Sequence, residues 1–219
     1  MHRFFSEKLE LDKNILHQLK NVLRIKRGER FILFDGSGYD YISDFSGRDS
    51  VNIIEKVLSR REPERKVFLF QSLLKKDKME WVFQKGTELG VFEFVPIISA
   101  RSIKKDFNQS RAEKIIKEAA EQSGRALVPK VDEVINFEKA LAFVQEERLT
   151  GVFTDPNSKK HISELLKDTK AALFVGPEGG WSDEEVSEAK EHGFKAISLG
   201  RLQLRSETAA IVASAFLIS

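Results

Sequence analysis

The first part of the chain carries short apolar runs that predict a small β-rich unit. Apolar residues within 11–23 keep a three-to-four spacing, which predicts a helix. Strand-like runs separated by turn residues then follow at residues 31–34, 39–45 and 51–58. Residues 59–66 are charged, contain a proline and offer no apolar face, so they predict a linker that closes a first domain at residues 1–66.

The rest of the chain alternates between strand-like and helix-like segments. Strand-like apolar runs occur at residues 67–73, 92–98, 151–154, 171–175 and 195–199, with amphipathic segments between them. This alternation is typical of a parallel sheet with helices on its faces. We therefore expect an α/β fold in a second domain at residues 67–219.

Two helices of this second domain carry signals for their ends. Ser110 with Glu113, and Ser182 with Glu185, have the three-residue spacing of a capping box, which satisfies free backbone N–H groups of the first turn. Gly193 stands where a left-handed residue would end the second of these helices.

A glycine-rich loop, residues 176–180 with the sequence GPEGG, follows the expected strand at 171–175. Glycines let backbone N–H and C=O groups approach a ligand closely, and proline stiffens the turn. The loop lacks the Lys and Ser/Thr of a P-loop, and no Rossmann G-x-G-x-x-G is present, so a nucleoside triphosphate site is disfavoured. A strand, glycine loop and helix also occur in purely structural roles, so this loop alone leaves the ligand open.

A second loop of similar character begins about 25 residues later. Leu199 and Gly200 end the expected strand at 195–199, and a final helix is expected from Glu207 to Ser219. Parallel strands bring their carboxyl ends to the same edge of a sheet, so the two loops are expected to meet there and share one ligand.

Composition limits the kinds of site that are possible. The chain has no cysteine, which removes disulfides and thiolate metal sites and fits a reducing compartment. Its four histidines are scattered without ligand spacing, so we expect no metal. The amino terminus lacks the apolar core of a signal peptide and no apolar run is long enough to span a membrane, so we expect a soluble cytoplasmic protein.

Charge is nearly balanced overall, at +2, but basic residues gather in two segments. One segment holds Lys20, Arg24, Lys26, Arg27 and Arg30; the other holds Arg101, Lys104, Lys105, Arg111, Lys114, Lys117, Arg125 and Lys130. Such runs are often solvated helix faces, but two of them also fit a surface that binds phosphates of a nucleic acid.

Several stretches resemble the SPOUT methyltransferases, and the RsmE branch of that superfamily in particular. The two loops, GPEGGWSDEE at 176–185 and LGRLQLRSETA at 199–209, resemble its cofactor loops. Further agreement lies in VLRIKRGERFILFDGSG at 22–38, KMEWVFQKGTELGV at 78–91, ARS at 100–102 and EAAEQSGRALVPKV at 118–131. The stretches span nearly the whole chain in the same order, whereas residues 154–158, which should form the first cofactor-side loop, match less clearly.

The resemblance implies a fold and a function that periodicity could not show. It implies a PUA-like RNA-binding barrel at residues 1–66 and, at 67–219, a SPOUT domain whose carboxyl-terminal segment forms a trefoil knot. It also implies a homodimer that uses S-adenosylmethionine to methylate N3 of a uridine in small-subunit (16S) ribosomal RNA. No metal and no membrane would take part.

The same resemblance assigns roles to individual residues. The expected cofactor site comprises Thr154, Phe174, Val175, Gly176, Pro177, Glu178, Gly179, Gly180, Leu199, Gly200, Leu202, Leu204, Arg205, Glu207 and Thr208. Because uridine N3 must lose its proton, a neighbouring cation or base should contribute, and the candidates are Arg205, Arg101 and Glu88. The expected RNA contacts are Lys20, Arg24, Lys26, Arg27, Arg30, Arg101 and Arg125.

Each of these roles has a simpler alternative. Arg205 could clamp a phosphate or pair with Glu207, Glu178 could satisfy loop amides, and Glu88 could make a contact between helices. Two other functions also stay open: a ribosome-binding protein without catalysis, and a methyltransferase that acts on the ribose 2′-oxygen.

Overall fold

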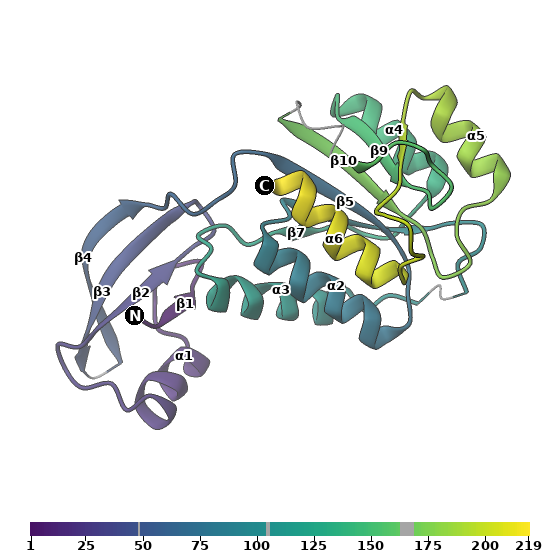
Figure 1. The fold of residues 1–219 in the computed structure, drawn as a ribbon. Coiled ribbons are helices and arrows are strands. Elements are labelled where there is room, and N and C mark those ends of the chain that lie inside the picture. The colour runs from purple at the N-terminus through teal and green to yellow at the C-terminus, as the bar shows by residue number, and fades with distance from the viewer. Residues whose placement is uncertain (48, 104–105, 163–168) are drawn as a thin grey trace. The chain divides into compact units, whose positions relative to one another are not determined.

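The chain folds into two compact units. The computed structural model describes residues 1–47, 49–103, 106–162 and 169–219. The first unit comprises residues 1–62 and 117–128, and the second comprises residues 63–116 and 129–219 (Figure 1). This division differs from the single boundary expected at residue 66, because a segment from the middle of the chain joins the first unit.

The first unit is built on a four-stranded sheet in the order β1-β2-β3-β4. Its elements are β1 (Arg3–Phe5), α1 (Lys13–His17), a π-helical turn η1 (Gln18–Val22), β2 (Arg30–Phe34), β3 (Tyr39–Gly47) and β4 (Ser50–Leu58). β1 pairs with β2 in parallel, and the other two pairs are antiparallel. Ile15 and Leu19 enter the core as the helical spacing predicts, but Val22 is 64% exposed because the helix continues as the wider π turn.

Polar contacts explain why residues 117–128 belong to the first unit. The guanidinium of Arg3 binds both carboxylate oxygens of Asp40 at 2.8 Å and also donates to the carbonyl of Arg125. Glu121 accepts a hydrogen bond from the backbone N–H of Phe5 at 2.8 Å. The contacts of Arg3 with Arg125 and of Phe5 with Glu121 join residues 122 and 116 positions apart in the sequence, so the local pattern could not reveal them.

The second unit is an α/β fold around one seven-stranded parallel sheet. The strand order is β11-β9-β10-β5-β6-β7, and β8 also pairs with β6. The strands are β5 (Lys66–Ser72), β6 (Glu93–Ile98), β7 (Lys130–Val131), β8 (Ile135–Asn136), β9 (Thr150–Thr154), β10 (Lys170–Val175) and β11 (Lys195–Ile197). The parallel α/β architecture predicted from the sequence is confirmed, but β11 ends two residues early, so Leu199 lies in a loop.

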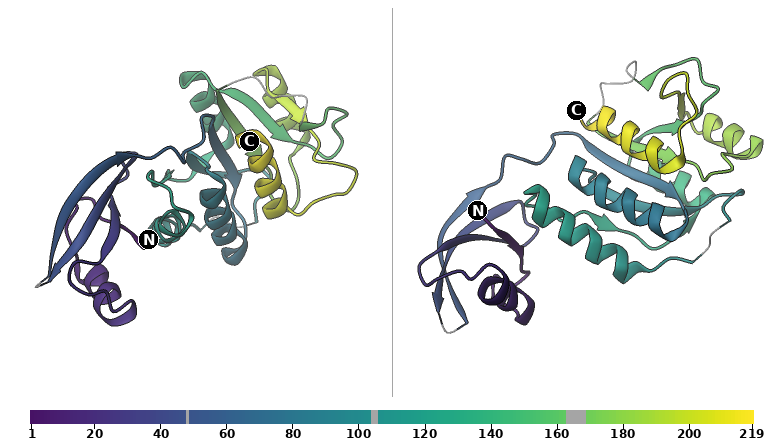
Figure 2. Two further views of the ribbon diagram at one scale, coloured as in Figure 1. Left: turned by 60° about the vertical axis from the view of Figure 1, so that its left-hand side comes forward. Right: turned by 60° about the horizontal axis from the view of Figure 1, so that its bottom comes forward.

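Helices cover both faces of this sheet. They are α2 (Lys76–Leu89), α3 (Gln109–Ser123), α4 (Phe137–Glu146), α5 (Asp183–Glu191) and α6 (Ser206–Ile218), and the last residues of α3 belong to the first unit. On one face, α4 and α5 share a core with alternate residues of the central strands, such as Phe70 and Phe174, whose rings stack at 4.4 Å. On the other face, α2 and α6 pack side by side (Figure 2). There the ring of Phe83 in α2 contacts the ring of Phe94 in β6, with 5.2 Å between the ring centroids.

The helix ends follow the sequence signals only in part. The capping box of Ser182 with Glu185 is present at the start of α5, and Gly193 is left-handed with φ +80° just beyond its end. The capping box expected at Ser110 is wrong: α3 begins at Gln109, and Asn108 accepts the hydrogen bond from the N–H of Arg111 at 3.0 Å. Asn is as good an N-cap as Ser, and here it stands two residues earlier.

A buried carboxyl in this sheet predicts an unusual pH dependence of stability. Burial, together with the neighbouring Asp132, raises the pKa of Glu93 to about 7. Between pH 4.5, the ordinary pKa of a glutamate, and about pH 7, Glu93 keeps its proton in the folded protein and loses it in the unfolded chain. Glu93 should therefore destabilise the folded protein increasingly as the pH rises through this range. Glu93→Gln should remove this loss, on the order of 1–2 kcal/mol in the free energy of unfolding at pH 8. Urea denaturation at pH 5 and pH 8 measures the effect.

The matched control for Glu93→Gln is Glu146→Gln, at an exposed position on α4. The control should leave the pH dependence of the parent protein unchanged. An equal gain at pH 5 and pH 8 in Glu93→Gln would mean that the ionisation of Glu93 does not cause the dependence.

Candidate active site

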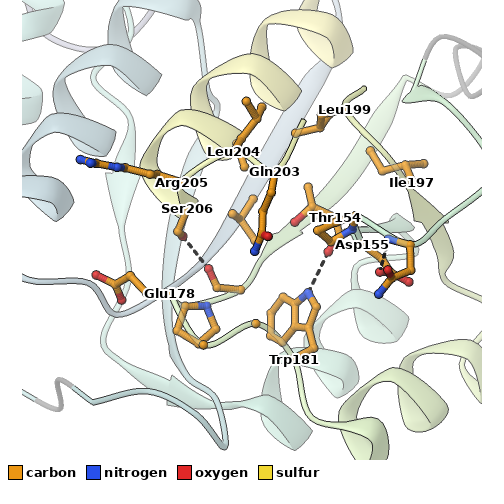
Figure 3. A pocket seen from close by; sticks show the side chains of 18 of the residues that line it. Thr154, Asp155, Glu178, Trp181, Ile197, Leu199, Gln203, Leu204, Arg205 and Ser206 are labelled. Carbon is orange, nitrogen blue, oxygen red and sulfur yellow. Dashed lines mark hydrogen bonds between the residues drawn. The ribbon is translucent and has the colours of Figure 1, made fainter. Parts of the chain in front are cut away.

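One pocket lies at the carboxyl edge of the sheet, where the loops after β9, β10 and β11 meet. It encloses about 700 Å³, a volume within the usual range for a small-molecule site. Figure 3 shows side chains from all three loops lining it. The loops at 176–180 and 199–206 therefore meet at one edge of the sheet, as predicted, and both line this pocket.

The loop after β10 is held against the loop after β9 by Trp181. The indole Nε1 donates to the carbonyl of Thr154 at 3.1 Å (Figure 3). A Cβ on Gly176 would lie 3.1 Å from this indole, so the close approach of backbone and ring requires glycine there. The loop is also anchored at the start of α5, because Glu185 of the capping box accepts a hydrogen bond from the backbone N–H of Ala100 at 2.8 Å.

The loop after β11 is held from the other side. Gly200 has φ +128°, a conformation that an L side chain rarely adopts. After the loop, α6 begins at Ser206, whose hydroxyl donates to the carbonyl of Gly176 at 2.5 Å. This hydrogen bond joins the loop after β11 to the loop after β10.

An ionic contact joins the same two parts of the chain, the loop after β10 and the start of α6. The ammonium of Lys78, in the first turn of α2, lies 3.0 Å from Glu178 and 3.8 Å from Glu207. Burial alone would raise the pKa of Glu178, but the hydrogen bond and the charge of Lys78 outweigh it and lower that pKa. The hydrogen bond from Glu178 in turn raises the pKa of Lys78. Both groups are therefore charged at neutral pH.

Two of the three candidate catalytic residues lie at the pocket. Arg101 and Arg205 both line it, and the guanidinium of Arg101 donates to the carbonyl of Gly179 at 3.1 Å. Glu88 does not line it, because α2 runs away from the carboxyl edge and Glu88 lies in its last turn, paired with Lys85 at 2.8 Å. The structure gives Glu88 the simpler role of a surface ion pair.

Twelve of the fifteen expected cofactor residues line the pocket. They are Thr154, Val175, Gly176, Pro177, Glu178, Gly179, Gly180, Leu199, Gly200, Leu202, Leu204 and Arg205. Phe174 points into the core instead, since side chains alternate along β10, and it is fully buried against Phe70. Glu207 and Thr208 do not line the pocket, although Ser206 and Ala209 on either side of them in α6 do, and Glu207 is 7% exposed beside Lys78.

The remaining residues that line the pocket were not expected individually from the sequence. These are Asp155, Pro156, Asn157, Trp181, Asp183, Val186, Ile197, Gln203, Ser206 and Ala209, in addition to Arg101, which was expected as a catalytic and RNA contact. Residues 155–157 directly follow the expected strand at 151–154, so the rule that placed the other two loops at this edge also identifies them. The segment 154–158 was expected to form the first cofactor-side loop, but its weaker family likeness left the individual contacts of residues 155–157 unassigned.

The basic residues of the first segment are exposed. Arg24, Lys26, Arg27 and Arg30 are exposed, and Lys20 is exposed and forms an ion pair with Asp49. Arg125 differs, because its side chain is buried and its guanidinium binds Glu62 at 2.9 Å and 3.1 Å. Its place in the first unit is structural, and the expected RNA contact by Arg125 is not supported.

The second basic segment is less uniform than its sequence indicates. Arg111 binds Glu80 at 2.8 Å, and Lys130 lies 3.6 Å from Glu93. Lys104 and Lys105 lie outside the described residues. Within the ranges that the structure describes, no cluster of His, Asp and Glu has the composition of a metal site, and no helix is long and apolar enough to cross a membrane.

Comparison with known proteins agrees with this site. Residues 61–218 match the family model described as RNA methyltransferase domain. Over 216 residues the chain is 34% identical to ribosomal RNA small subunit methyltransferase E of Bacillus subtilis, covering 90% of this chain and 84% of that protein. The chain therefore belongs to the RNA methyltransferase family, and within it to the group of ribosomal RNA small subunit methyltransferase E.

Solved structures extend the likeness to both units. The ribosomal RNA small subunit methyltransferase E of Neisseria gonorrhoeae, bound to S-adenosyl methionine, is 34% identical with a TM-score of 0.89, and covers 98% of this chain and 95% of its own. A methyltransferase of Legionella pneumophila with bound S-adenosylmethionine is 31% identical with a TM-score of 0.86, and covers 97% and 94%.

Proposed function

We propose that this protein transfers a methyl group from S-adenosylmethionine to N3 of a uridine in small-subunit (16S) ribosomal RNA. The observation that carries the proposal is the single pocket formed by three strand-end loops, in a chain similar over nearly its whole length to small-subunit ribosomal RNA methyltransferases. The expected trefoil knot, PUA-like barrel and cytoplasmic location belong to this proposal and rest on the likeness to the family.

The residues of the pocket suit this cofactor. Carboxylates at Asp155, Glu178 and Asp183 stand at a site that would receive a cationic sulfonium and ammonium. Apolar side chains supply the walls that a nucleoside needs, and backbone groups of the glycine loops supply hydrogen-bonding atoms. When bound, S-adenosylmethionine supplies an activated methyl group and leaves as a neutral thioether.

The protein has to position the uridine and remove its N3 proton. A positive charge near the base lowers the cost of forming the uridine anion, and Arg205 and Arg101 are the cations that line the pocket. Arg205 is exposed at the start of α6, so its guanidinium can meet a substrate that enters from solvent. A uridine paired in a duplex hides N3, so the target base must be unpaired or flipped out.

The site of methylation is tested by nucleoside analysis. Small subunits from a strain that lacks this protein are incubated with the purified protein and isotopically labelled S-adenosylmethionine, and the RNA is digested and analysed by mass spectrometry. Label in 3-methyluridine is the expected result. Label on a ribose would establish the 2′-oxygen as the target, and RNA binding without label would indicate a non-catalytic protein.

The first unit is proposed to hold the RNA backbone through its exposed basic residues. Arg24→Ala with Arg27→Ala should weaken binding of ribosomal RNA and reduce its dependence on salt by about one phosphate contact per lost charge. Affinity for S-adenosylmethionine should stay unchanged. Filter binding between 50 and 200 mM salt, roughly the range in which counterion release is large, measures the effect.

A control for this pair is available in the second unit. Arg148 is exposed and has φ +54°, close to the φ of +52° at Arg24, so Arg148→Ala combined with Lys139→Ala removes two charges with a similar backbone change. The proposed RNA surface would be wrong if the control pair weakened binding as much as the test pair.

The proposed homodimer has an apolar surface available in the second unit. Trp81 of α2 is 45% exposed and Phe216 of α6 is 40% exposed, on two helices that pack together (Figure 2). Large exposed apolar side chains of this kind are typical of surfaces that a partner covers, and a second copy of this chain is the partner that the family likeness indicates.

A further inference from the structure

A buried glutamine stands beside the pocket, directly after the apolar run of strand β5. Gln71 lies near the end of β5 after Phe68, Leu69 and Phe70, and it is 1% exposed. Burying an amide costs free energy unless hydrogen bonds replace those to water. Leu or Met would fill the same volume without that cost, so the amide points to a specific task.

The hydrogen bonds of Gln71 lead to the pocket. Its Nε2 donates to the hydroxyl of Ser206 at 3.1 Å and to the carbonyl of Ser72 at 2.9 Å, and it lies 3.5 Å from the carbonyl of Val175. Val175 is also the residue paired with Gln71 in the sheet. These acceptors fix the orientation of the amide, because turning it over would place Oε1 against two carbonyl oxygens.

Ser206 links Gln71 to the loop after β10 through a second hydrogen bond. Its hydroxyl has one proton, which it donates to the carbonyl of Gly176 at 2.5 Å (Figure 3), so it can only accept from Gln71. The chain of donors therefore runs in one direction, from the amide of Gln71 through Ser206 to Gly176. Both Ser206 and Gly176 line the pocket, and they come from different loops.

We propose that Gln71 is a positioning residue for the methyl donor, because it orients Ser206 and so sets the spacing between the loops after β10 and β11. The inference rests on the proposed function of this pocket as the S-adenosylmethionine site. Lys78 joins the loop after β10 to the start of α6 as well, but its side chain is one-quarter exposed and its ammonium lies 3.8 Å from Glu207. The buried hydrogen bonds give the tighter constraint, since water does not compete for them.

Two substitutions of Gln71 separate hydrogen bonding from packing. Gln71→Leu keeps the volume and removes the donor, and it should weaken binding of S-adenosylmethionine about tenfold at every pH. Gln71→Glu should bind as weakly at pH 8 but regain affinity as the pH falls, because the introduced carboxyl donates to Ser206 only when protonated. Isothermal titration calorimetry from pH 5.5 to pH 8.5 measures both.

Ser206 supplies the second arm of the experiment. Ser206→Ala should lose about tenfold in affinity and Ser206→Thr, which keeps the hydroxyl, should lose much less. Because the two residues act through one chain of hydrogen bonds, Gln71→Leu with Ser206→Ala should lose about as much as either single change, and not the product of the two. Ser43→Ala removes another buried serine hydroxyl, in the first unit, and should leave the affinity unchanged.

The outcomes distinguish the inference from the function on which it rests. Parent-like affinity in folded Gln71→Leu and Ser206→Ala proteins, or multiplicative losses in the double variant, would overturn the positioning role alone. If Gln71→Leu does not fold, the contrast between Ser206→Ala and Ser206→Thr decides. Absence of S-adenosylmethionine binding by the parent protein would overturn the proposed function and the inference with it.

Discussion

Arg205→Ala is expected to lower the rate of methyl transfer about 100- to 1000-fold while changing the affinity for S-adenosylmethionine by less than about threefold. The reason is that Arg205 lines the pocket with a permanent positive charge where the uridine anion would form. The loss should shrink as the pH rises, because solvent hydroxide then takes over removal of the N3 proton. Single-turnover assays with labelled cofactor between pH 7 and pH 9 measure the rate.

Arg201 provides the control for Arg205. It is an exposed arginine in the same loop, and it is absent from the residues that line the pocket. Arg201→Ala should keep a rate within about twofold of the parent protein. A rate loss in Arg205→Ala that does not change with pH would contradict the proposed stabilisation of the anion.

Gly200→Ala is expected to reduce affinity for S-adenosylmethionine by about tenfold or more. At φ +128° a Cβ strains the backbone by about 1–3 kcal/mol, and the loop can relieve that strain only by moving the pocket wall that Leu199 and Leu202 form. Calorimetry measures the affinity, and thermal unfolding separates it from a loss of stability.

Gly193→Ala is the matched control for this glycine. Gly193 also has a positive φ, +80°, and no atom within 4 Å of an added Cβ, but it follows α5 and does not line the pocket. It should lose stability and keep cofactor affinity. Similar affinities in the two variants would show that the loop conformation at Gly200 does not shape the site.

The sequence predicted the second unit well because its signals are local. Strands β5, β6, β9 and β10 are long apolar runs, and the capping box at Ser182 involves residues three positions apart. The common site of two loops followed from one geometric rule, that parallel strands end at the same edge. The helix start at Asn108 was missed because Ser110 and Glu113 offer the same signal two residues later.

The features that the sequence did not reveal depend on distant contacts. Glu62 accepts from the side chain of Arg125 and from two backbone N–H groups after it, which turns a residue expected on the RNA surface into part of a buried network. Gln71 gave no signal either, since the role of a polar residue after an apolar run depends here on Ser206, 135 residues later. Local patterns report on strands and turns, whereas the roles of buried polar residues are set by their tertiary partners.

The central claim is that three loops at one sheet edge enclose a single S-adenosylmethionine. The most direct test is a crystal structure of this protein grown with that cofactor. The claim predicts the cofactor between residues 154–157, 176–181 and 199–206, with Arg205 beside the methyl group. A cofactor bound elsewhere, or loops that lie apart with a nucleotide phosphate between them, would contradict it.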